Sequence, residues 1–297
     1  MKRCIITDQV NSDFEEALKK CRKLGYPYIE IHSIWGKTVE QLSEEDARHA
    51  YELIQKYEMQ VVVLASTLFL MTPLRDQDAL RKFDPAYPAF VGTYAEHVAA
   101  LEHTLKIAKI MGCANIRVFS FRSPENRIVI GDDDDQFLII DRFRTPVKMA
   151  ENAGVTLLLE NCPYCHLPKG TMTKRITDHF QSPHFKLLWD PANSYQSVKD
   201  RIPRKYLNAT LEEEMRSIFK SIGHIHIKDL KYVLHEIKPF KPSILGQGDV
   251  AYKEILQILK DGDYHGFCSL ETELNVPDTI VSMIVFNSML ESMHIRR

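Results

Sequence analysis

Short apolar runs of strand length alternate with amphipathic helical stretches along the whole chain. This alternation is typical of βαβ units, in which each helix returns the chain so that the next strand lies parallel to the last. The runs that we interpret as strands are Cys4–Thr7, Tyr28–His32, Gln60–Ser66, Asn115–Phe121, Thr156–Glu160, Lys186–Asp190, Ile222–His226 and Phe267–Glu271. Eight such units predict an α/β fold, the (β/α)₈ TIM barrel, which typically takes roughly 250 residues.

The stretches between these runs carry helix signals. The clearest predicted helices are Ser12 to about Gly25, Ser43–Tyr57, Tyr94–Met111, Gln136–Asn152, Tyr252–Lys260 and Asp278–Met293. The first should open with a capping box formed by Ser12 and Glu15. The four acids at Asp132–Asp135 are expected to lie in a solvated loop. Because no low-complexity linker divides the chain, we expect residues 1–297 to form a single domain.

The composition excludes several classes of protein. The 38 Lys and Arg residues against 40 Asp and Glu residues give a net charge of −2, so nothing favours nucleic acid as a partner. No apolar stretch has the length of a signal peptide or a membrane span, which indicates a cytoplasmic protein without a membrane partner. The six cysteines are expected to be reduced thiols.

Four of the predicted strands end in a residue that can bind a metal or exchange a proton: Glu160, Asp190, His226 and Glu271. In β/α barrels the chemistry collects at the carboxyl ends of the strands. Taken singly, Glu160 would equally fit a helix cap or an ion pair, and Asp190 the start of a turn. Together, three carboxylates and one imidazole predict a divalent-metal site suited to Mn²⁺, Mg²⁺ or Co²⁺.

Residues beside these strand ends are candidates for supporting roles. His224 and His226 share a strand face, so we take His226 as the ligand and His224, one step deeper, as its support and a substrate-binding candidate. Lys228 continues the same face outward. It could hold a substrate hydroxyl, carboxylate or phosphate, or simply be a surface lysine.

Two motifs point elsewhere but weakly. Cys162-Pro163-Tyr164-Cys165 has the C-x-x-C spacing of redox and zinc sites, yet it lies in the middle of a long chain without a second such pair. Gly246-Gln247-Gly248-Asp249 is rich in glycine but lacks the dinucleotide-binding and Walker patterns. We therefore expect neither redox chemistry at the first motif nor phosphate binding at the second.

The strand ends and their neighbours resemble the xylose isomerase-like TIM barrel superfamily, the sugar phosphate isomerase and epimerase group that also contains endonuclease IV. The matching segments are Leu157–Asn161, Leu187–Asn193, Gly223–Asp229, Leu245–Val250 and Ser269–Thr272. They occur in the order and spacing that the superfamily has, and they span more than the C-terminal third of the chain.

The resemblance implies an enzyme, an isomerase or epimerase that acts on a small carbohydrate, a sugar, keto-sugar or sugar phosphate. In the ketose 3-epimerases of the family, residues matching Glu160, Asp190, His226 and Glu271 bind one divalent ion, Mn²⁺ or Co²⁺, and the two glutamates exchange the substrate proton. We expect Mn²⁺ first, with Co²⁺, Mg²⁺ and Zn²⁺ as alternatives. Homo-oligomers are common in the family, although the sequence offers no interface signal.

The chain departs from the family pattern after Asp190. Asn193 stands where the epimerases and endonuclease IV have a histidine, and an asparagine is a poor metal ligand but can hydrogen-bond a sugar hydroxyl. This argues against a three-zinc nuclease centre. His32, at the end of the second predicted strand, is a further substrate-binding candidate that could face the pocket. The loops 67–93 and 122–135 are expected to roof it.

Three alternatives stay open at this point. A lyase of the inosose dehydratase or C-glycoside-cleaving kind would begin with the same proton abstraction next to a keto group. An endonuclease IV-type repair enzyme would need several zinc ions and a basic face, which neither Asn193 nor the net charge supports. A non-catalytic sugar-binding protein would keep the barrel without the reaction.

Overall fold

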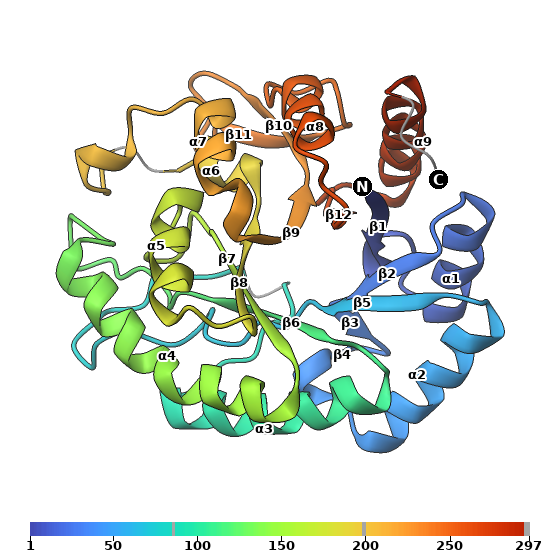
Figure 1. The fold of residues 1–297 in the computed structure, drawn as a ribbon, viewed down its shortest axis with the longest axis horizontal. Helices are drawn as coiled ribbons and strands as arrows, with labels where there is room; N and C mark the ends of the chain where they lie inside the picture. The colour runs from blue at the N-terminus through green and yellow to red at the C-terminus, as the bar shows by residue number, and fades with distance from the viewer. Residues whose placement is uncertain (85–86, 198–199, 294–297) are drawn as a thin grey trace.

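In a computed structural model, which describes residues 1–84, 87–197 and 200–293, eight parallel strands close into a barrel surrounded by helices (Figure 1). Around the barrel the strands follow the order β1-β12-β9-β8-β7-β6-β5-β2. Their bounds are β1 Lys2–Ile6, β2 Tyr28–Ile31, β5 Gln60–Leu64, β6 Asn115–Phe119, β7 Thr156–Glu160, β8 Phe185–Trp189, β9 Ile222–Ile227 and β12 Phe267–Leu270. The predicted (β/α)₈ TIM barrel is confirmed.

The helices form the outer ring of the barrel (Figure 1). They are α1 Phe14–Lys23, α2 Glu44–Lys56, α3 Tyr94–Ile110, α4 Asp133–Ala153, α5 Gly170–Phe180, α6 Pro191–Tyr195, α7 Leu211–Ile218, α8 Tyr252–Asp261 and α9 Val276–Ser292. Short 3₁₀ helices are η1 Thr7–Gln9, η2 Val39–Gln41, η3 Arg204–Tyr206 and η4 Phe219–Ser221. Two hairpins, β3 Ser33–Ile34 with β4 Lys37–Thr38 and β10 Asp229–Tyr232 with β11 Phe240–Ser243, project from the loops. Within the described ranges no helix is long and apolar enough to cross a membrane.

The barrel interior changes from apolar to ionic along its axis. Because side chains two apart share a strand face, Leu158 and Glu160 of β7 point the same way, as do Leu188 and the residue that follows β8, Asp190. Leu158 and Leu188 belong to a small buried apolar cluster with Cys4. The acidic residues lie one step further along the same faces, at the carboxyl ends of the strands.

The predicted cap of the first helix is wrong by one residue. Asp13, and not Ser12, is the N-cap of α1, and its Oδ1 accepts a hydrogen bond of 2.9 Å from the backbone N–H of Glu16. Asn11 in turn accepts from the N–H of Asp13 at 2.9 Å. Both Ser and Asp favour this position, but the aspartate also places a negative charge at the positive end of the helix.

The expectation of a solvated loop at Asp132–Asp135 is also wrong. Asp132 is the N-cap of α4, and its Oδ1 accepts a 2.9 Å hydrogen bond from the N–H of Asp135, so the acidic run forms the first turn of the helix. Acids are favoured at this position by the helix dipole. Asp135 itself is fully buried.

Asp135 sits at the centre of what we call the rim cluster, which comprises Arg75, Arg127, Asp135 and His166. Its carboxylate accepts hydrogen bonds from Arg75, from Arg127 Nη1 at 2.7 Å and from the N–H of Gly131 at 2.8 Å, and it pairs with His166 Nδ1 at 2.9 Å. Burial raises the pKa of Asp135, but the bonds from His166 and Arg127 outweigh it and leave the pKa well below its usual range. The cluster joins the loops that follow β5, β6 and β7.

Candidate metal centre

Four strand ends bring their side chains together inside the barrel. Glu160 ends β7, Asp190 follows β8, His226 lies in β9 and Glu271 follows β12. Each offers one ligand-type atom, all of these atoms lie within 4.8 Å of one another, and all four residues are buried. We call this group the metal centre.

The donor atoms of the metal centre suit a hard divalent cation. His226 Nδ1 lies 3.3 Å from Glu271 Oε2 and 3.6 Å from Glu160 Oε1. Asp190 Oδ2 is buried and has no hydrogen bond among the described residues, although Lys228 Nζ lies 3.2 Å away. Three carboxylates and one imidazole form an oxygen-rich set for ions such as Mn²⁺ or Mg²⁺, with Zn²⁺ also able to bind.

Two buried cations accompany the acids. Arg117 Nη1 donates to Glu271 Oε1 at 2.8 Å and to Glu160 Oε2 at 3.3 Å, so one guanidinium joins the two glutamates. Lys228 Nζ lies 3.4 Å from Glu271 Oε2 and donates to Glu273 at 2.8 Å. Lys228 is 4% exposed, so the alternative of a surface lysine is not what the structure shows.

The charges around the metal centre do not balance. The buried acids are Glu30, Glu160, Asp190 and Glu271, and the buried non-histidine cations beside them are Arg117 and Lys228. The acids outnumber these cations by two. Burial acts to lower the pKa of His226, but Glu30, Glu271 and Glu160 raise it well above its ordinary value, so this imidazole offsets part of the excess. Buried charges normally have partners, so the excess fits a bound metal.

The pKa values in the metal centre are displaced in both directions. Burial raises the pKa of Asp190, and the nearby Glu160 and Glu271 add to this effect while Lys228 opposes it. Burial also acts to raise the pKa of Glu271, but Lys228, His226 and Arg117 together hold that pKa well below its usual range. Carboxyl groups with shifts of opposite sign in one place are typical of acid/base chemistry.

Asn193 lies in the first turn of α6 and contacts two of these acids. Its backbone N–H donates to Asp190 Oδ1 at 2.9 Å, and its side-chain Nδ2 donates to Glu160 Oε1 at 3.0 Å. Its Oδ1 accepts from Gln196 at 3.1 Å. The amide therefore orients Glu160, which is how an asparagine takes part in the site without being a ligand.

His32 is not brought into the metal centre. It follows β2, its Nδ1 pairs with Asp8 at 2.8 Å, and its Nε2 lies 3.1 Å from the carbonyl oxygen of Pro88. The ring stacks on Tyr87 with a centroid distance of 4.9 Å. Both ring nitrogens are thus engaged by protein groups.

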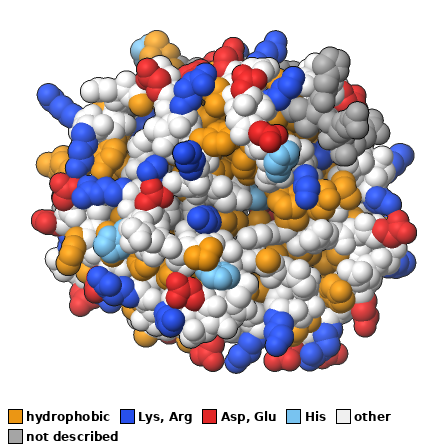
Figure 2. Space-filling model, in the orientation of Figure 1, with side chains coloured by type: hydrophobic (Ala, Val, Ile, Leu, Met, Phe, Trp, Pro, Cys, Tyr) orange, Lys and Arg blue, Asp and Glu red, His pale blue; other side chains and the backbone are white. Residues whose placement is uncertain are grey.

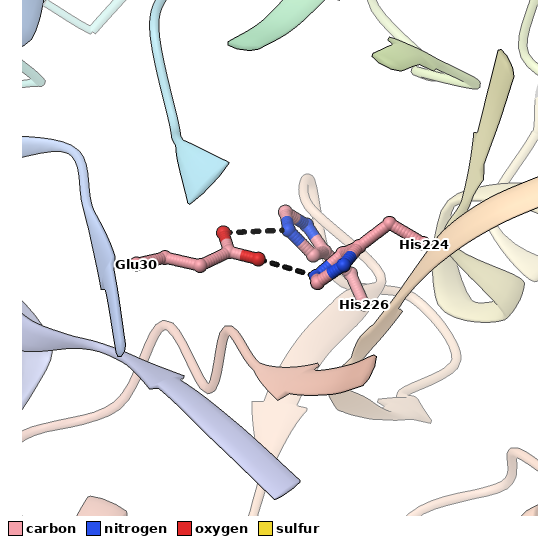
Figure 3. Close-up of side chains that lie close together, drawn as sticks. All are labelled: Glu30, His224 and His226. Atoms are coloured by element: carbon pink, nitrogen blue, oxygen red, sulfur yellow. Dashed lines mark hydrogen bonds and ion pairs between the residues drawn. The ribbon is translucent and has the colours of Figure 1, made fainter. Parts of the chain in front are cut away.

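His224 lies one layer below the metal centre, beside a carboxylate that sequence reasoning missed. Its Nε2 is 2.8 Å from Ser269 Oγ and also pairs with Glu30 of β2. Glu30 reaches across the barrel toward both histidines of β9 (Figure 3). We expected His224 to support His226 directly. In the structure His224 contacts Glu30, and Glu30 contacts His226.

Glu30 and Arg117 share a signal that could have revealed them. Each is a lone charge in the middle of an apolar predicted strand. Both faces of a barrel strand are covered, so a charge in that position must find a buried partner. The alternation of side chains then places both on the inner face, beside the metal centre.

The two loops that we expected over the pocket contact each other. Arg122, in the loop after β6, donates from Nη2 to the carbonyl of Lys82, in the loop after β5, at 2.9 Å. Tyr87 of the earlier loop stacks on His32. Tyr87 is 37% exposed, but burial around its hydroxyl raises its pKa, with Arg117 opposing and Glu271 contributing.

The glycine-rich segment is occupied by a side chain of the chain itself. The N–H groups of Gly246 and Gly248 donate to Asp229 Oδ2 at 2.8 and 3.0 Å, and those of Leu230 and Val250 donate to Oδ1 at 2.9 and 3.2 Å. A Cβ at Gly248 would lie 2.2 Å from Asp229 Oδ1. The donors that could cradle a phosphate are therefore already used.

The C-x-x-C segment holds two buried, unbridged thiols. Cys162 and Cys165 follow β7 and belong to a small apolar cluster with Phe119. Burial raises the pKa of the Cys165 thiol well above its ordinary value. A protonated, buried thiol is a poor nucleophile and metal ligand, which agrees with the expectation that this motif is structural.

A comparison of the sequence with protein families gives one match. The model of the family described as xylose isomerase-like TIM barrel matches residues 18–283. No curated protein matches the sequence.

Several solved structures resemble this one over nearly their whole length. The IolI protein with a bound zinc atom has a TM-score of 0.70 at 17% identity, covering 98% of this chain and 99% of its own. The probable 3-DHS dehydratase AsbF from Bacillus anthracis gives 0.69 at 17% identity, with 97% and 99% covered. The 3-keto-D-glucoside 4-epimerase YcjR from E. coli gives 0.68 at 13% identity, with 96% and 98% covered. At these identities the likeness shows a shared fold.

Proposed function

Because the chain belongs to the xylose isomerase-like TIM barrel family, we propose that it is a metal-dependent isomerase or epimerase of a small sugar or keto-sugar. The observation that carries this proposal is the convergence of four buried ligand-type side chains, Glu160, Asp190, His226 and Glu271, whose ligand atoms all lie within 4.8 Å of one another. Two structurally similar proteins support it: one is a keto-glucoside epimerase, and another binds zinc. We assign the four residues one divalent ion, Mn²⁺ first, with Co²⁺, Mg²⁺ or Zn²⁺ as alternatives.

The proposed reaction moves a proton next to a carbonyl group. A bound divalent ion would polarise the carbonyl and the neighbouring hydroxyl and so stabilise the enediolate that forms when the C–H proton leaves. Glu160 and Glu271 act as the acid/base pair, one removing the proton and the other returning it. Arg117 donates to both carboxylates and holds them at a fixed separation.

Other residues take supporting roles in this proposal. Lys228 places an ammonium beside Asp190 and Glu271, where it can contact a substrate oxygen as negative charge develops. Asn193 acts through Glu160, which it orients. His32 acts through Tyr87, on which it stacks, and His224 acts through Glu30.

A lyase is the second candidate, favoured by the structural likeness to a probable dehydratase. It would use the same proton abstraction, followed by loss of water or an aglycone from the product. The endonuclease alternative gains no support, because positive and negative side chains are interspersed over the face seen in Figure 2 and Asn193 replaces a ligand. A sugar-binding protein without activity remains the outcome if the following experiment fails.

The test combines metal analysis with isotope exchange. The purified protein is stripped with a chelator, reloaded with Mn²⁺ and incubated with a panel of ketoses and keto-sugars in D₂O. We expect about one equivalent of Mn²⁺ and deuterium incorporation next to the carbonyl of at least one substrate. Glu160→Gln and Glu271→Gln should each lower turnover by roughly 10²–10⁴-fold, the usual contribution of a general acid or base.

The matched control is Glu102→Gln, which removes an exposed carboxylate on α3. It should retain both the metal and the activity. Full activity in Glu160→Gln and Glu271→Gln, or no Mn²⁺ in the reloaded wild type, would contradict the proposed function. A product that has lost water would select the lyase.

A further inference from the structure

We propose that Glu30 is a positioning residue for the metal centre, which holds His226 with Nε2–H turned toward β2 so that Nδ1 presents its lone pair to the ion. The inference rests on the proposed function in one respect, namely that a divalent ion binds at the four strand ends. It adds a carboxylate from β2 to a site whose ligands come from β7, β8, β9 and β12.

The contacts of Glu30 are all to groups that can donate a hydrogen bond. Oε2 lies 3.1 Å from His226 Nε2, and Oε1 accepts from Ser269 Oγ at 2.6 Å and pairs with His224 Nε2. The carboxylate is fully buried, so these neighbours replace water. Figure 3 shows the carboxylate facing both rings of β9, with one oxygen directed to each.

The two nitrogens of His226 face different partners. Nε2 points at Glu30, whereas Nδ1 lies 3.3 Å from Glu271 Oε2 and 3.6 Å from Glu160 Oε1. Both nitrogens face carboxylate oxygens, but those at Nδ1 belong to the proposed ligands, whereas Glu30 at Nε2 does not. When an ion takes the place of a hydrogen at Nδ1, the remaining hydrogen of the neutral imidazole lies on Nε2, where Glu30 accepts it. The lone pair then lies on Nδ1, which faces the other three ligands.

A carboxylate behind a ligating histidine also strengthens the ligand. It fixes the ring orientation and raises the basicity of the nitrogen that binds the ion, and loss of such a partner typically weakens metal binding by about 10–100-fold. Glu30 is suited to this role because Arg117 and Lys228 contact the other acids of the site, which leaves its carboxylate to the two histidines and Ser269.

Glu30, His224 and His226 could instead hold an ion of their own, since their ligand-type atoms also cluster. The hydroxyl of Ser269 already occupies Oε1 of Glu30 at 2.6 Å, and His224 Nε2 is shared between Glu30 and Ser269. A metal there would have to break these contacts. We therefore expect one equivalent of metal and not two.

The experiment compares Mn²⁺ affinity in the wild type, Glu30→Gln and Ser269→Ala by competition with a chelator. Glu30→Gln keeps the shape but loses the charge and one acceptor atom, so the Kd for Mn²⁺ should rise by about 10–100-fold. Ser269→Ala is the matched control, because it removes a different contact of Glu30 and leaves those to His224 and His226. Its Kd should stay within about threefold of the wild type.

A second readout reports the tautomer directly. In ¹⁵N-histidine NMR spectra of the Zn²⁺-loaded wild type, His226 should show a protonated Nε2 and an Nδ1 whose chemical shift is changed by the metal. A purely structural role for Glu30 would not require this pattern. This measurement needs no variant, so the inference can be tested even if Glu30→Gln fails to fold.

The outcomes separate the two proposals. A wild type that binds no Mn²⁺ overturns both. A wild type that binds one equivalent with the same Kd as Glu30→Gln overturns the role of Glu30 alone, as does a His226 that binds Zn²⁺ through Nε2. Two equivalents in the wild type, one of them lost in Glu30→Gln, would show that Glu30 is a ligand of a separate site.

Discussion

The metal centre on the barrel axis and the rim cluster around Asp135 both bury carboxylates, but they compensate the charge differently. In the rim cluster Asp135 is surrounded by Arg75, Arg127 and His166 and accepts a backbone N–H as well, and a second buried carboxylate, Asp78, lies 3.9 Å from His166. In the metal centre several carboxylates share Arg117 and Lys228, and one carboxylate oxygen of Asp190 accepts no hydrogen bond.

The difference shows which property marks a functional site. Burial and ion pairing are common to both regions, and in the rim cluster they serve to join three loops. In the rim cluster His166 lies between Asp135 and a second buried carboxylate, Asp78, whereas in the metal centre three carboxylates lie within 4.8 Å of one another, where an ion or a proton would relieve their repulsion. The excess of one sign, and not the presence of buried charge, is the informative observation.

The largest effect that would test this comparison is expected at the rim. Asp135→Asn leaves the buried ends of two arginines without their anionic partner, and removing one member of a buried pair typically costs about 3–5 kcal/mol. We expect a loss of this size in the free energy of unfolding, measured with urea.

The control for that variant is Asp133→Asn, two residues earlier in the same helical turn. Asp133 is exposed and pairs with Arg175 and Lys205 at the surface, so its loss should not change the urea midpoint measurably. Equal midpoints for Asp135→Asn and the wild type would show that the rim cluster does not stabilise the fold.

A smaller effect should appear when metal is added. An ion that binds only the folded protein stabilises it by about 2.7 kcal/mol at a concentration 100 times its Kd. Mn²⁺ should therefore raise the unfolding midpoint of the wild type and of Asp135→Asn by similar amounts, and should leave Glu271→Gln almost unchanged. If Mn²⁺ failed to stabilise Asp135→Asn, the two regions would not be independent.

The smallest effect concerns acid pH. The pKa of Asp135 is lowered in the folded protein, whereas the unfolded chain takes up the proton near a pKa of about 3.9. Below that pH the unfolded state binds more protons than the folded state. The contribution of Asp135 to the free energy of unfolding therefore falls by at most about 1.4 kcal/mol per pH unit. The difference in unfolding free energy between the wild type and Asp135→Asn should be constant from pH 7 to 5 and should narrow below pH 4. A difference that persists unchanged to pH 3 would contradict the assignment.

The fold and the outline of the metal centre could be predicted because both follow from local pattern and strand direction. Alternating elements indicate a parallel barrel, and parallel strands bring their carboxyl ends to one side. Residues such as Glu160 and His226 could therefore be grouped without knowledge of a single contact. Whether they bind a metal stays a prediction.

The remaining features depend on contacts that span the barrel. Glu30 meets His226 across 196 positions in sequence, and Arg117 meets Glu271 across 154. Glu30 and Arg117 are each marked locally as a lone charge in an apolar strand, but the local sequence does not indicate which partner each meets. The roles of Asn193 and His32 were equally out of reach, because they depend on which neighbour occupies each polar atom.

The loop that follows β11 carries a built-in occupant, and this has a consequence for redesign. Asp229 lies in β10, in the hairpin that precedes this loop, and accepts hydrogen bonds from the N–H groups of the loop. Because it is part of the same chain, its effective concentration at these N–H groups is one that a free phosphate ester cannot match. An engineer who wished this barrel to accept phosphorylated sugars at that loop would have to vacate the position first. The first substitution would replace Asp229 by a smaller neutral residue, which frees these N–H groups before the metal centre is changed.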